Sequence, residues 1–190
     1  MKKYFLLFFV SVIFFACNSD NNKKPAGTET SDSAHPVWIT QGNIYEVNTR
    51  QYTKEGTFMA FANHLDRLKE MGVQTVWFMP INPISKKDRK GSLGSYYAVA
   101  DYTAINPEYG NMEDWKALVK KIHDKGMKVL IDWVPNHTGA DHPWLQTHPD
   151  FFVKDSTGKA ATMFDWTDTR VLDFTNNEMQ DSMIAAMKFW

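Results

Sequence analysis

The sequence has a single cysteine and almost no excess of charge, and each shortage excludes a class of protein. With Cys17 as the only cysteine among 190 residues, no disulfide can form within the chain, so the fold is not a disulfide scaffold. The 21 basic residues nearly balance 22 acidic ones, and a formal net charge of -1 gives no reason to expect nucleic acid as a partner. An apolar content of 43% is ample for one domain with a sizeable core.

The chain also begins with an apolar stretch that is too short to span a bilayer comfortably. Residues 4–16 are apolar and follow a basic start, an arrangement typical of a secretory signal. The junction of Ala16 and Cys17 resembles a bacterial lipobox, in which the cysteine carries the lipid. We therefore expect a signal peptide over residues 1–17, lipidation of Cys17 and a membrane-anchored lipoprotein at the cell envelope, on the outer membrane or cell surface. An ordinary signal peptide with an incidental cysteine is the alternative.

Polar and small residues from 18 to 36 predict a flexible tether, because the segment has too few large apolar groups to repay the entropy of ordering. Beyond it, three apolar runs alternate with helical patterns. The runs predict strands at 44–47, 73–79 and 127–134, and the patterns predict helices at 57–72, 111–126 and 175–190. This alternation indicates right-handed βαβ units in a parallel sheet, and therefore an α/β fold.

The three helices have recognisable starts and apolar stripes. The first is predicted to be capped by Thr57, the second by Asn111, and the third by a capping box at 175–178. The expected buried stripes are Phe58, Phe61, Leu65 and Leu68; Trp115, Leu118, Val119 and Ile122; and Met179, Met183, Ile184 and Met187.

The third strand ends in a polar cluster. Val129, Leu130 and Ile131 form an uninterrupted apolar run, which predicts a strand covered on both faces and ended by Pro135. Residues 132–137 then lie at its carboxyl end, where α/β folds bind ligands. A zinc site built from nearby His and Asp residues is the weaker alternative, because the spacings do not match known zinc signatures.

Two connections are longer than ordinary loops. Residues 81–109 are either functional or poorly ordered, and the charged run 86–90 is interpreted as a solvated loop tip rather than an anion site. Residues 138–174 are interpreted as a small excursion domain. The chain is thus divided into a signal peptide (1–17), a tether (18–36), barrel units (37–137), an excursion (138–174) and a third barrel helix (175–190).

Four segments resemble the α-amylase superfamily of glycoside hydrolases. Residues 132–137 (DWVPNH) are similar to the family's first signature, an Asp followed after three residues by Asn-His. Residues 44–47, 72–80 and 97–110 resemble its first strand, its second strand and the following loop, in the expected order. The resemblance implies the N-terminal portion, about three βα units, of a (β/α)8 TIM barrel with an excursion domain after the third strand. Such a portion would leave two sheet edges open and an inner face rich in Val, Ile, Trp and Phe uncovered.

The resemblance also implies roles for individual residues. Tyr97 would stack under the sugar at the cleavage point, and His137 would hydrogen-bond that sugar. Asp101 and Asp132 would support the site, and Asn136 and Asp173 are possible calcium ligands. The nucleophilic Asp and the acid/base Glu are expected beyond Trp190.

The expected function is therefore that of a retaining glycosidase, an α-amylase-like hydrolase acting on α-glucan or malto-oligosaccharide. Residues 1–190 alone are expected to be inactive. The alternatives are a non-catalytic α-glucan-binding surface lipoprotein and a transglycosylase of the same family.

Overall fold

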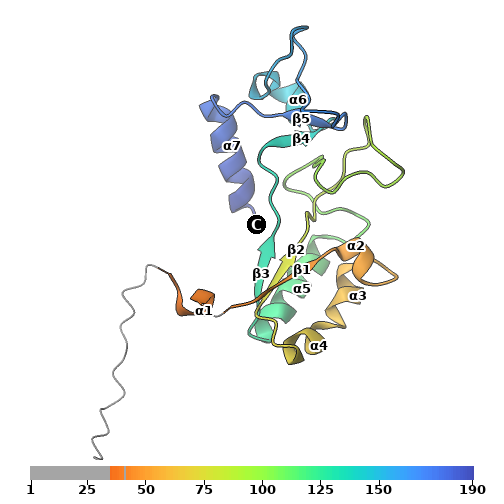
Figure 1. Ribbon diagram of the computed structural model, residues 1–190, viewed down its shortest axis with the longest axis vertical. Helices are drawn as coiled ribbons and strands as arrows, with labels where there is room; N and C mark the ends of the chain where they lie inside the picture. The colour runs from red at the N-terminus through yellow and green to blue at the C-terminus, as the bar shows by residue number, and fades with distance from the viewer. Residues whose placement is uncertain (1–34, 41) are drawn as a thin grey trace, which may run out of the picture.

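The computed structural model describes residues 35–40 and 42–190. The expected signal peptide, the expected lipidation site Cys17 and most of the expected tether lie outside the described residues. The described part begins with the short helix α1 (Val37–Thr40) and continues into a parallel sheet with helices on one side and a smaller unit at its carboxyl end (Figure 1). Within it, no helix is both long enough and apolar enough to cross a membrane.

The sheet contains three parallel strands in the order β1-β2-β3. Their bounds are β1 Ile44–Val47, β2 Thr75–Phe78 and β3 Lys128–Ile131. The register pairs Ile44 with Thr75 and Thr75 with Lys128, so the carboxyl ends of all three strands meet at one edge. The parallel sheet predicted from the sequence is therefore confirmed.

The first crossover is more broken than predicted. The short helix α2 (Thr49–Tyr52) comes first, and α3 (Phe58–Ala62) and α4 (Leu65–Glu70) then stand in place of one helix from 57 to 72. Thr57 caps α3 as expected, accepting a hydrogen bond from the Ala60 N–H at 3.2 Å. The helix is interrupted at Asn63 and His64, which are among the weaker helix formers. The expected apolar stripe is buried all the same, since all four of its residues are at most 1% exposed.

The second crossover is the helix α5 (Met112–Asp124), which matches its prediction closely. Asn111 caps it and forms a full capping box with Asp114. Trp115, Leu118 and Ile122 are buried, while Val119 is only partly buried. Gly126 ends the helix region with φ of +73°, a conformation that glycine adopts without strain.

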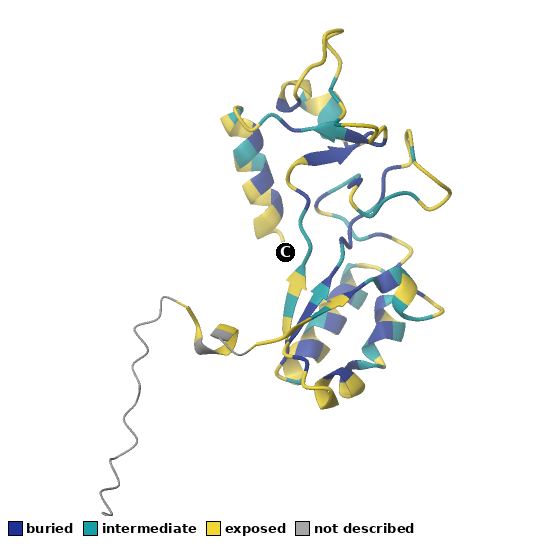
Figure 2. Cartoon of the chain, in the orientation of Figure 1, coloured by how far each residue is buried: buried dark blue, intermediate teal, exposed yellow. Residues whose placement is uncertain are grey.

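The main core lies between one face of the sheet and helices α3, α4 and α5 (Figure 2). Val76 and Phe78 of the central strand are fully buried there, and the Phe78 ring meets Trp115 at a centroid distance of 5.1 Å. The opposite face carries side chains that alternate with these. In the described residues it is largely open, and Ile44 and Leu130 are 60% and 44% exposed.

One face of β3 is open in the described residues, as expected for a portion of a barrel, so the cover on both faces that the apolar run predicted is not found there. The open face carries Ile44, Glu46, Thr75, Trp77, Lys128 and Leu130, so Ile and Trp are present as expected but Val and Phe are not. The strand also ends at Ile131, before Pro135. The chain leaves the sheet there because Trp133 stacks on Tyr102 at 5.3 Å and Val134 joins the second core.

The excursion forms a second, smaller core at the carboxyl end of the strands. Its elements are the antiparallel strands β4 (His137–Gly139) and β5 (Thr169–Val171), helix α6 (Trp144–Thr147) and the 3-10 helix η1 (Pro149–Phe151). Phe151 and Phe152 are fully or almost fully buried in this core together with Tyr102 from the long loop. The excursion and that loop therefore share one apolar core.

Helix α7 (Asn177–Lys188) follows the excursion and packs against this second core (Figure 1). Its cap is Asn176, which accepts from the Met179 N–H at 3.1 Å, so the predicted capping box beginning at Thr175 is wrong. Met179 and Met183 are buried as expected, but Ile184 and Met187 are 47% and 51% exposed. Ala186 is buried in their place, which rotates the apolar stripe.

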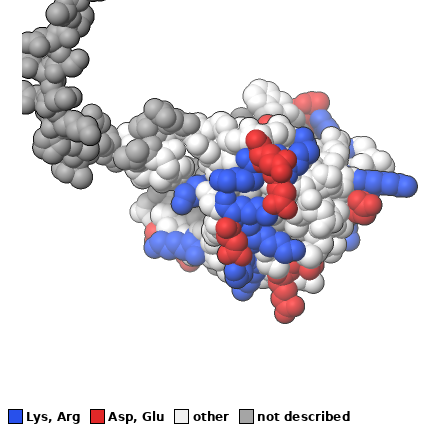
Figure 3. Space-filling model, turned by 90° about the horizontal axis from the view of Figure 1, so that it is seen from below, with Lys and Arg blue, Asp and Glu red and all other residues white. Residues whose placement is uncertain are grey.

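Charged side chains of both signs are interspersed on the face seen from below the sheet (Figure 3). This face therefore presents no extended field of a single sign.

We predict that residues 37–190, expressed alone, self-associate. The exposed Ile44 and Leu130 lie on the open sheet face, and β1 and β3 are edge strands in the described fold. Size-exclusion chromatography with light scattering should show dimers or larger species, and Leu130→Gln should shift the distribution towards monomer. A monodisperse wild-type monomer would contradict the prediction.

Candidate functional site

A pocket of about 600 Å³ lies where the long loop meets the excursion, at the carboxyl end of the sheet. Tyr97 from the loop and His137 from the start of β4 both line it. The other lining residues are Lys90, Ser95, Asp165, Trp166, Asp168 and Thr169. The structure thus brings together the two residues expected to contact a sugar.

Tyr97 presents its ring to the pocket while its hydroxyl is fixed. The side chain is 38% exposed, and its hydroxyl donates to the Asp132 carboxylate at 3.0 Å. Partial burial, the bond to Asp132 and the charges of Asp132 and Glu46 raise the pKa of Tyr97 to about 12. The phenol is therefore neutral at physiological pH, and its orientation is set from the end of β3.

His137 is held in one tautomer. Its Nε2 lies 3.1 Å from the Tyr97 carbonyl oxygen, which can only accept, so Nε2 carries the proton. Its Nδ1 lies 3.1 Å from Nδ2 of Asn136, a donor, so Nδ1 is unprotonated. Burial lowers the pKa of His137, against the opposing effects of the bond to Tyr97 and the charge of Asp168. The imidazole is therefore a neutral donor through Nε2.

Asp168 adds a buried carboxylate to the wall of the same pocket. Its side chain is 4% exposed, and its Oδ2 has no hydrogen-bond partner in the described residues. Its backbone carbonyl accepts from Ala140 N–H at 2.9 Å, which fixes the segment beside β4. The negative charge of Asp168 favours protonation of His137, so the two groups are electrostatically coupled.

Tyr102 fixes the turn that carries His137. Its hydroxyl lies 2.8 Å from both the Val134 and His137 carbonyl oxygens, so one proton is shared between two acceptors. Its own carbonyl accepts from Asn82 Nδ2 at 3.0 Å and from Trp190 Nε1 at 2.8 Å. The ring is 2% exposed. These contacts connect the long loop with the segment after β3, with the start of β4 and with Trp190, which follows α7.

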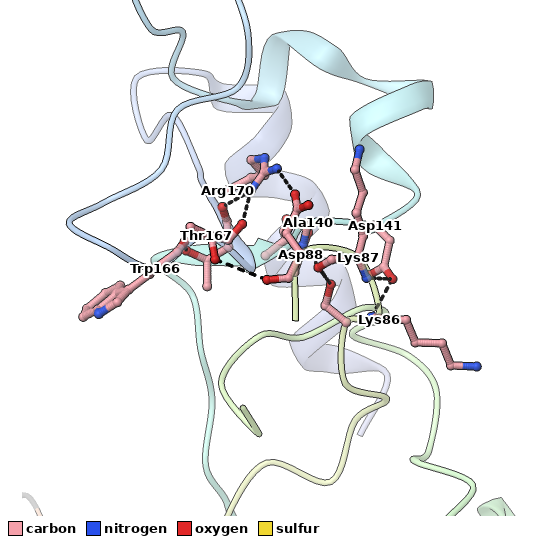
Figure 4. A network of polar contacts seen from close by, with 12 residues as sticks. Lys86, Lys87, Asp88, Ala140, Asp141, Trp166, Thr167 and Arg170 are labelled. Carbon is pink, nitrogen blue, oxygen red and sulfur yellow. Dashed lines mark hydrogen bonds and ion pairs between the residues drawn. The ribbon is translucent and has the colours of Figure 1, made fainter. Parts of the chain in front are cut away.

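The tip of the long loop is exposed to solvent and is also tied to the excursion (Figure 4). Arg170 donates to the Asp88 carboxylate at 2.8 Å and to the Thr167 carbonyl at 2.8 Å, and Thr167 donates to the Asp88 carbonyl at 3.2 Å. On the other side, the backbone N–H groups of Lys86 and Lys87 donate to Asp141 at 2.7 and 3.2 Å. Lys86, Lys87, Asp88 and Lys90 are all exposed, so the expected solvated tip is confirmed, and these contacts in addition order the loop.

The pocket combines aromatic surface with polar side chains. Tyr97 and Trp166 offer aromatic surface, and His137, Asp132 and Lys90 offer hydrogen-bonding groups around it. Comparison with known proteins identifies the family of the chain. A family model described as the catalytic domain of alpha amylase matches residues 17–190. The chain belongs to the alpha-amylase family.

Individual relatives agree with this assignment. Trehalose synthase of Pimelobacter sp. is 33% identical over 193 residues, covering 82% of this chain and 33% of its own length. The amino acid transporter heavy chain SLC3A1 of Mus musculus is 32% identical over 134 residues, covering 68% of this chain and 18% of its own. A crystal structure of an alpha-amylase from Lactobacillus plantarum superposes with a TM-score of 0.77 at 41% identity, over 78% of this chain and 36% of that one.

The chain spans about a third of the length of the first curated relatives that it matches. Its three parallel strands are the N-terminal part of the alpha-amylase family's TIM barrel, and the described residues do not form a closed barrel. The fold predicted from the sequence is confirmed.

In this alpha-amylase-family chain, the Asp101 side chain forms hydrogen bonds within its own loop. Its carboxylate accepts from the backbone N–H and the hydroxyl of Thr103 at 2.8 and 2.9 Å. Asp101 does not line the pocket of Tyr97 and His137. The Asp101 carboxylate therefore stabilises the turn formed by residues 101–103.

The calcium prediction stays a prediction, and the structure shows what its two expected ligands contact. Asn136 Nδ2 contacts His137, and the Asp173 carboxylate accepts from the N–H and hydroxyl of Thr175 at 2.9 and 2.7 Å. The bonds from Thr175 lower the pKa of Asp173. Calcium takes six to eight oxygen ligands, which include backbone and Asn carbonyl oxygens as well as carboxylates, so further ligands would have to join these two side chains.

Three residues of this site were missed by sequence reasoning: Tyr102, Trp166 and Asp168. Tyr102 lies within residues 97–110, the segment that resembles the family's loop after the second strand. Its role, however, depends on carbonyl groups more than 30 positions away. Trp166 and Asp168 reach the pocket because β4 pairs with β5, matching Gly139 with Thr169. No local pattern encodes that pairing.

We predict that Tyr102→Phe destabilises the complete protein by roughly 1–3 kcal/mol, because two carbonyl groups lose their buried partner. Denaturant unfolding measures this loss. Tyr96→Phe is the matched control, because it also removes a tyrosine hydroxyl and keeps the ring that Arg50 overlies at 4.8 Å. Equal stability of the two variants would show that the Tyr102 hydroxyl does not clamp the turn.

Proposed function

We propose that this chain is the N-terminal part of a retaining glycoside hydrolase that acts on α-glucans or malto-oligosaccharides. The proposal rests on one observation, the half-exposed ring of Tyr97 held at a pocket by the Asp132 carboxylate. A tyrosine ring offers an apolar face to the C–H face of a sugar and a polar edge to its hydroxyl groups. Membership of the alpha-amylase family supports this interpretation.

His137 is suited to form a hydrogen bond with the sugar that stacks on Tyr97. Its Nε2 proton is directed at a backbone carbonyl in the described state, and a sugar hydroxyl can replace that acceptor without any change of tautomer. Because the imidazole is neutral, it donates a hydrogen bond without placing a positive charge beside an oxocarbenium-like transition state. Asn136 acts through His137 by fixing its tautomer.

The carboxyl groups that carry out the reaction belong, in this proposal, to parts of the protein beyond Trp190. Retaining hydrolysis needs a nucleophile and an acid/base about 5–5.5 Å apart across the scissile bond. Asp132 already accepts the Tyr97 hydroxyl, Asp165 is paired with Lys90 at 2.8 Å, and Asp168 in the pocket wall is only 4% exposed. Residues 1–190 alone are therefore expected to bind sugar weakly and to hydrolyse none.

Two alternatives each have a specific observation in their favour. A non-catalytic, α-glucan-binding surface lipoprotein is favoured by the match to SLC3A1, whose name describes a transporter subunit rather than an enzyme. A transglycosylase is favoured by the match to trehalose synthase. Product analysis separates these functions: hydrolysis releases reducing ends, transfer rearranges linkages, and a binding protein leaves the glucan unchanged.

The place of action proposed here is the cell envelope, with the protein anchored through a lipidated Cys17. A basic start, an apolar stretch and the Ala16–Cys17 junction support this placement. One acyl chain binds a membrane only marginally, whereas the two or three chains of a bacterial lipoprotein attach it stably.

We predict that Tyr97→Ala lowers kcat/KM of the complete protein on maltotriose at least about tenfold while changing Tm little, because the ring stacks on substrate and is not in the core. His137→Ala should act alike, and Tyr97→Phe, which keeps the ring but loses the bond to Asp132, should have an activity between those of Tyr97→Ala and the wild type. Kinetics and thermal melts are measured on the same preparations, with residues 1–190 alone as an inactive reference. A core role for Tyr97 would instead cost ~3–5 kcal/mol of stability and leave the kinetics of the folded protein normal.

We predict that Cys17→Ser, with the signal segment kept, moves the protein from the detergent phase to the aqueous phase in Triton X-114 partitioning. Loss of the modified thiol removes the acyl chains that hold it. Ser11→Ala, a change within the apolar stretch, is the matched control and should stay in the detergent phase. Equal partitioning of wild type and Cys17→Ser would refute the anchor.

A further inference from the structure

The excursion carries a second pocket, of about 520 Å³, away from the pocket of Tyr97 and His137. Of the residues that the structure describes, none lines both pockets. Thr169 lines the first pocket and its neighbour Arg170 lines the second. Because consecutive side chains of a strand point to opposite faces, the two pockets lie on opposite faces of the β4–β5 sheet.

Positive charge is concentrated in this second pocket, which we call the basic pocket. Its lining contains the four cationic side chains Lys87, Lys154, Lys159 and Arg170. Asp155 is the only carboxylate among the described lining residues, and Asp88 outside the lining pairs with Arg170. Two positive charges are therefore left in excess, although the chain as a whole has a formal net charge of -1.

The Arg170 side chain is a fixed part of this pocket. It is 15% exposed, and its guanidinium donates to the carbonyl oxygens of Thr167 and Thr169 at 2.8 and 2.6 Å. A further bond reaches the Asp88 carboxylate at 2.8 Å. Arg170 therefore holds the walls of the basic pocket together, and the three lysines supply its uncompensated charge.

The turn that carries two of these lysines is also ordered. Oδ1 of Asp155 accepts from the N–H and hydroxyl of Thr157, both at 2.7 Å, and from the Lys159 N–H at 3.1 Å. The Lys154 ammonium group donates to the Pro149 carbonyl, which is a neutral acceptor. The turn thus presents its lysines on a backbone that needs little further ordering when a ligand binds.

Lys87, Lys154 and Lys159 form no ion pair within the described residues. The charged run 86–90 alone gives no reason to expect an anion site, since exposed lysines are normally solvated. What distinguishes Lys87 is its direction: its side chain extends towards α6, whereas that of Lys86 points away (Figure 4). The fold therefore brings Lys87 to the same pocket as two lysines that are far from it in the sequence.

A phosphate group matches this arrangement better than a carboxylate or a neutral sugar. A phosphate monoester carries nearly two negative charges at neutral pH and has three acceptor oxygens. Lysine ammonium groups bind phosphate as point charges, so several of them can share one group from different directions. A carboxylate would leave part of the charge uncompensated, and a sugar hydroxyl would leave all of it.

We propose that the basic pocket binds a phosphate group, either as free phosphate or as the headgroup of a lipid. This site is separate from the sugar pocket, and the inference does not depend on the function proposed above. It assigns a role to Lys87, Lys154 and Lys159 that sugar binding does not use.

The test measures binding of radiolabelled inorganic phosphate to the complete protein by equilibrium dialysis, with ionic strength held constant by sodium chloride. Lys87→Ala and Lys159→Ala should each weaken phosphate binding about threefold, and the double variant about tenfold. Lys86→Ala is the matched control, because it removes a neighbouring exposed lysine that does not line the basic pocket. It should leave phosphate binding unchanged.

A conservative variant separates the charge of Lys87 from its contribution to the fold. Lys87→Arg keeps the positive charge and should retain phosphate binding, with the same Tm as Lys87→Ala because the side chain is exposed. Equal loss of binding in Lys87→Arg and Lys87→Ala would show that the charge is not responsible and would overturn the proposal.

Vesicles distinguish the two sources of phosphate. The Cys17→Ser form of the complete protein, which has no thiol to acylate, is mixed with phosphatidylcholine vesicles with or without phosphatidic acid. Retention that needs phosphatidic acid, Lys87 and Lys159, and that inorganic phosphate reverses, identifies a lipid headgroup. Binding of inorganic phosphate without such retention identifies free phosphate.

Three results would overturn the basic pocket as a phosphate site. The wild-type protein binds no phosphate, the double variant binds as tightly as wild type, or Lys86→Ala weakens binding as much as Lys87→Ala. The last result would show that only diffuse surface charge is involved. None of them bears on the proposed function, which is tested by the kinetics of the Tyr97 variants.

Discussion

The candidate site depends on one buried hydroxyl group, that of Tyr102. It bridges the carbonyl oxygens of Val134 and His137, at the point where the chain leaves the sheet and enters the excursion. Burial raises the pKa of Tyr102, so the hydroxyl keeps its proton and remains a donor. Without this bridge, two carbonyl groups in an apolar core would lack this partner, and the turn that carries His137 would lose its contact with the long loop at Tyr102. The contact of the His137 side chain with Tyr97 depends on the backbone position that Tyr102 holds.

From that turn the pocket is assembled by polar contacts between segments distant in sequence. Asp132, one residue past β3, fixes the hydroxyl of Tyr97, whose backbone carbonyl in turn accepts from His137. The excursion is fastened to the long loop by Arg170 and Asp88, which places Trp166 beside His137. The result is a surface that presents a neutral hydrogen-bond donor, aromatic faces and carboxylates.

Much of the fold could be predicted because its signals are local. Strand runs, the Asn111 cap and the apolar stripe of α5 depend on residues within a few positions of one another. The errors arose where tertiary contacts decide. β3 ends early because Trp133 is drawn to Tyr102, and the stripe of α7 rotates to bury Ala186 in place of Ile184. Tyr97 and His137 were found through ordered family motifs, whereas Trp166 and Asp168 reach the site only through the β4–β5 pairing.

The central claim is that one glucosyl unit stacks on Tyr97 within reach of His137. A crystal structure of the complete protein with bound maltotriose tests it most directly. The account predicts a sugar ring against the face of Tyr97, with a hydroxyl about 2.6–3.2 Å from Nε2 of His137, which has then released the Tyr97 carbonyl. Maltotriose bound elsewhere, with Nε2 of His137 still on that carbonyl and the ring of Tyr97 unoccupied, would contradict it.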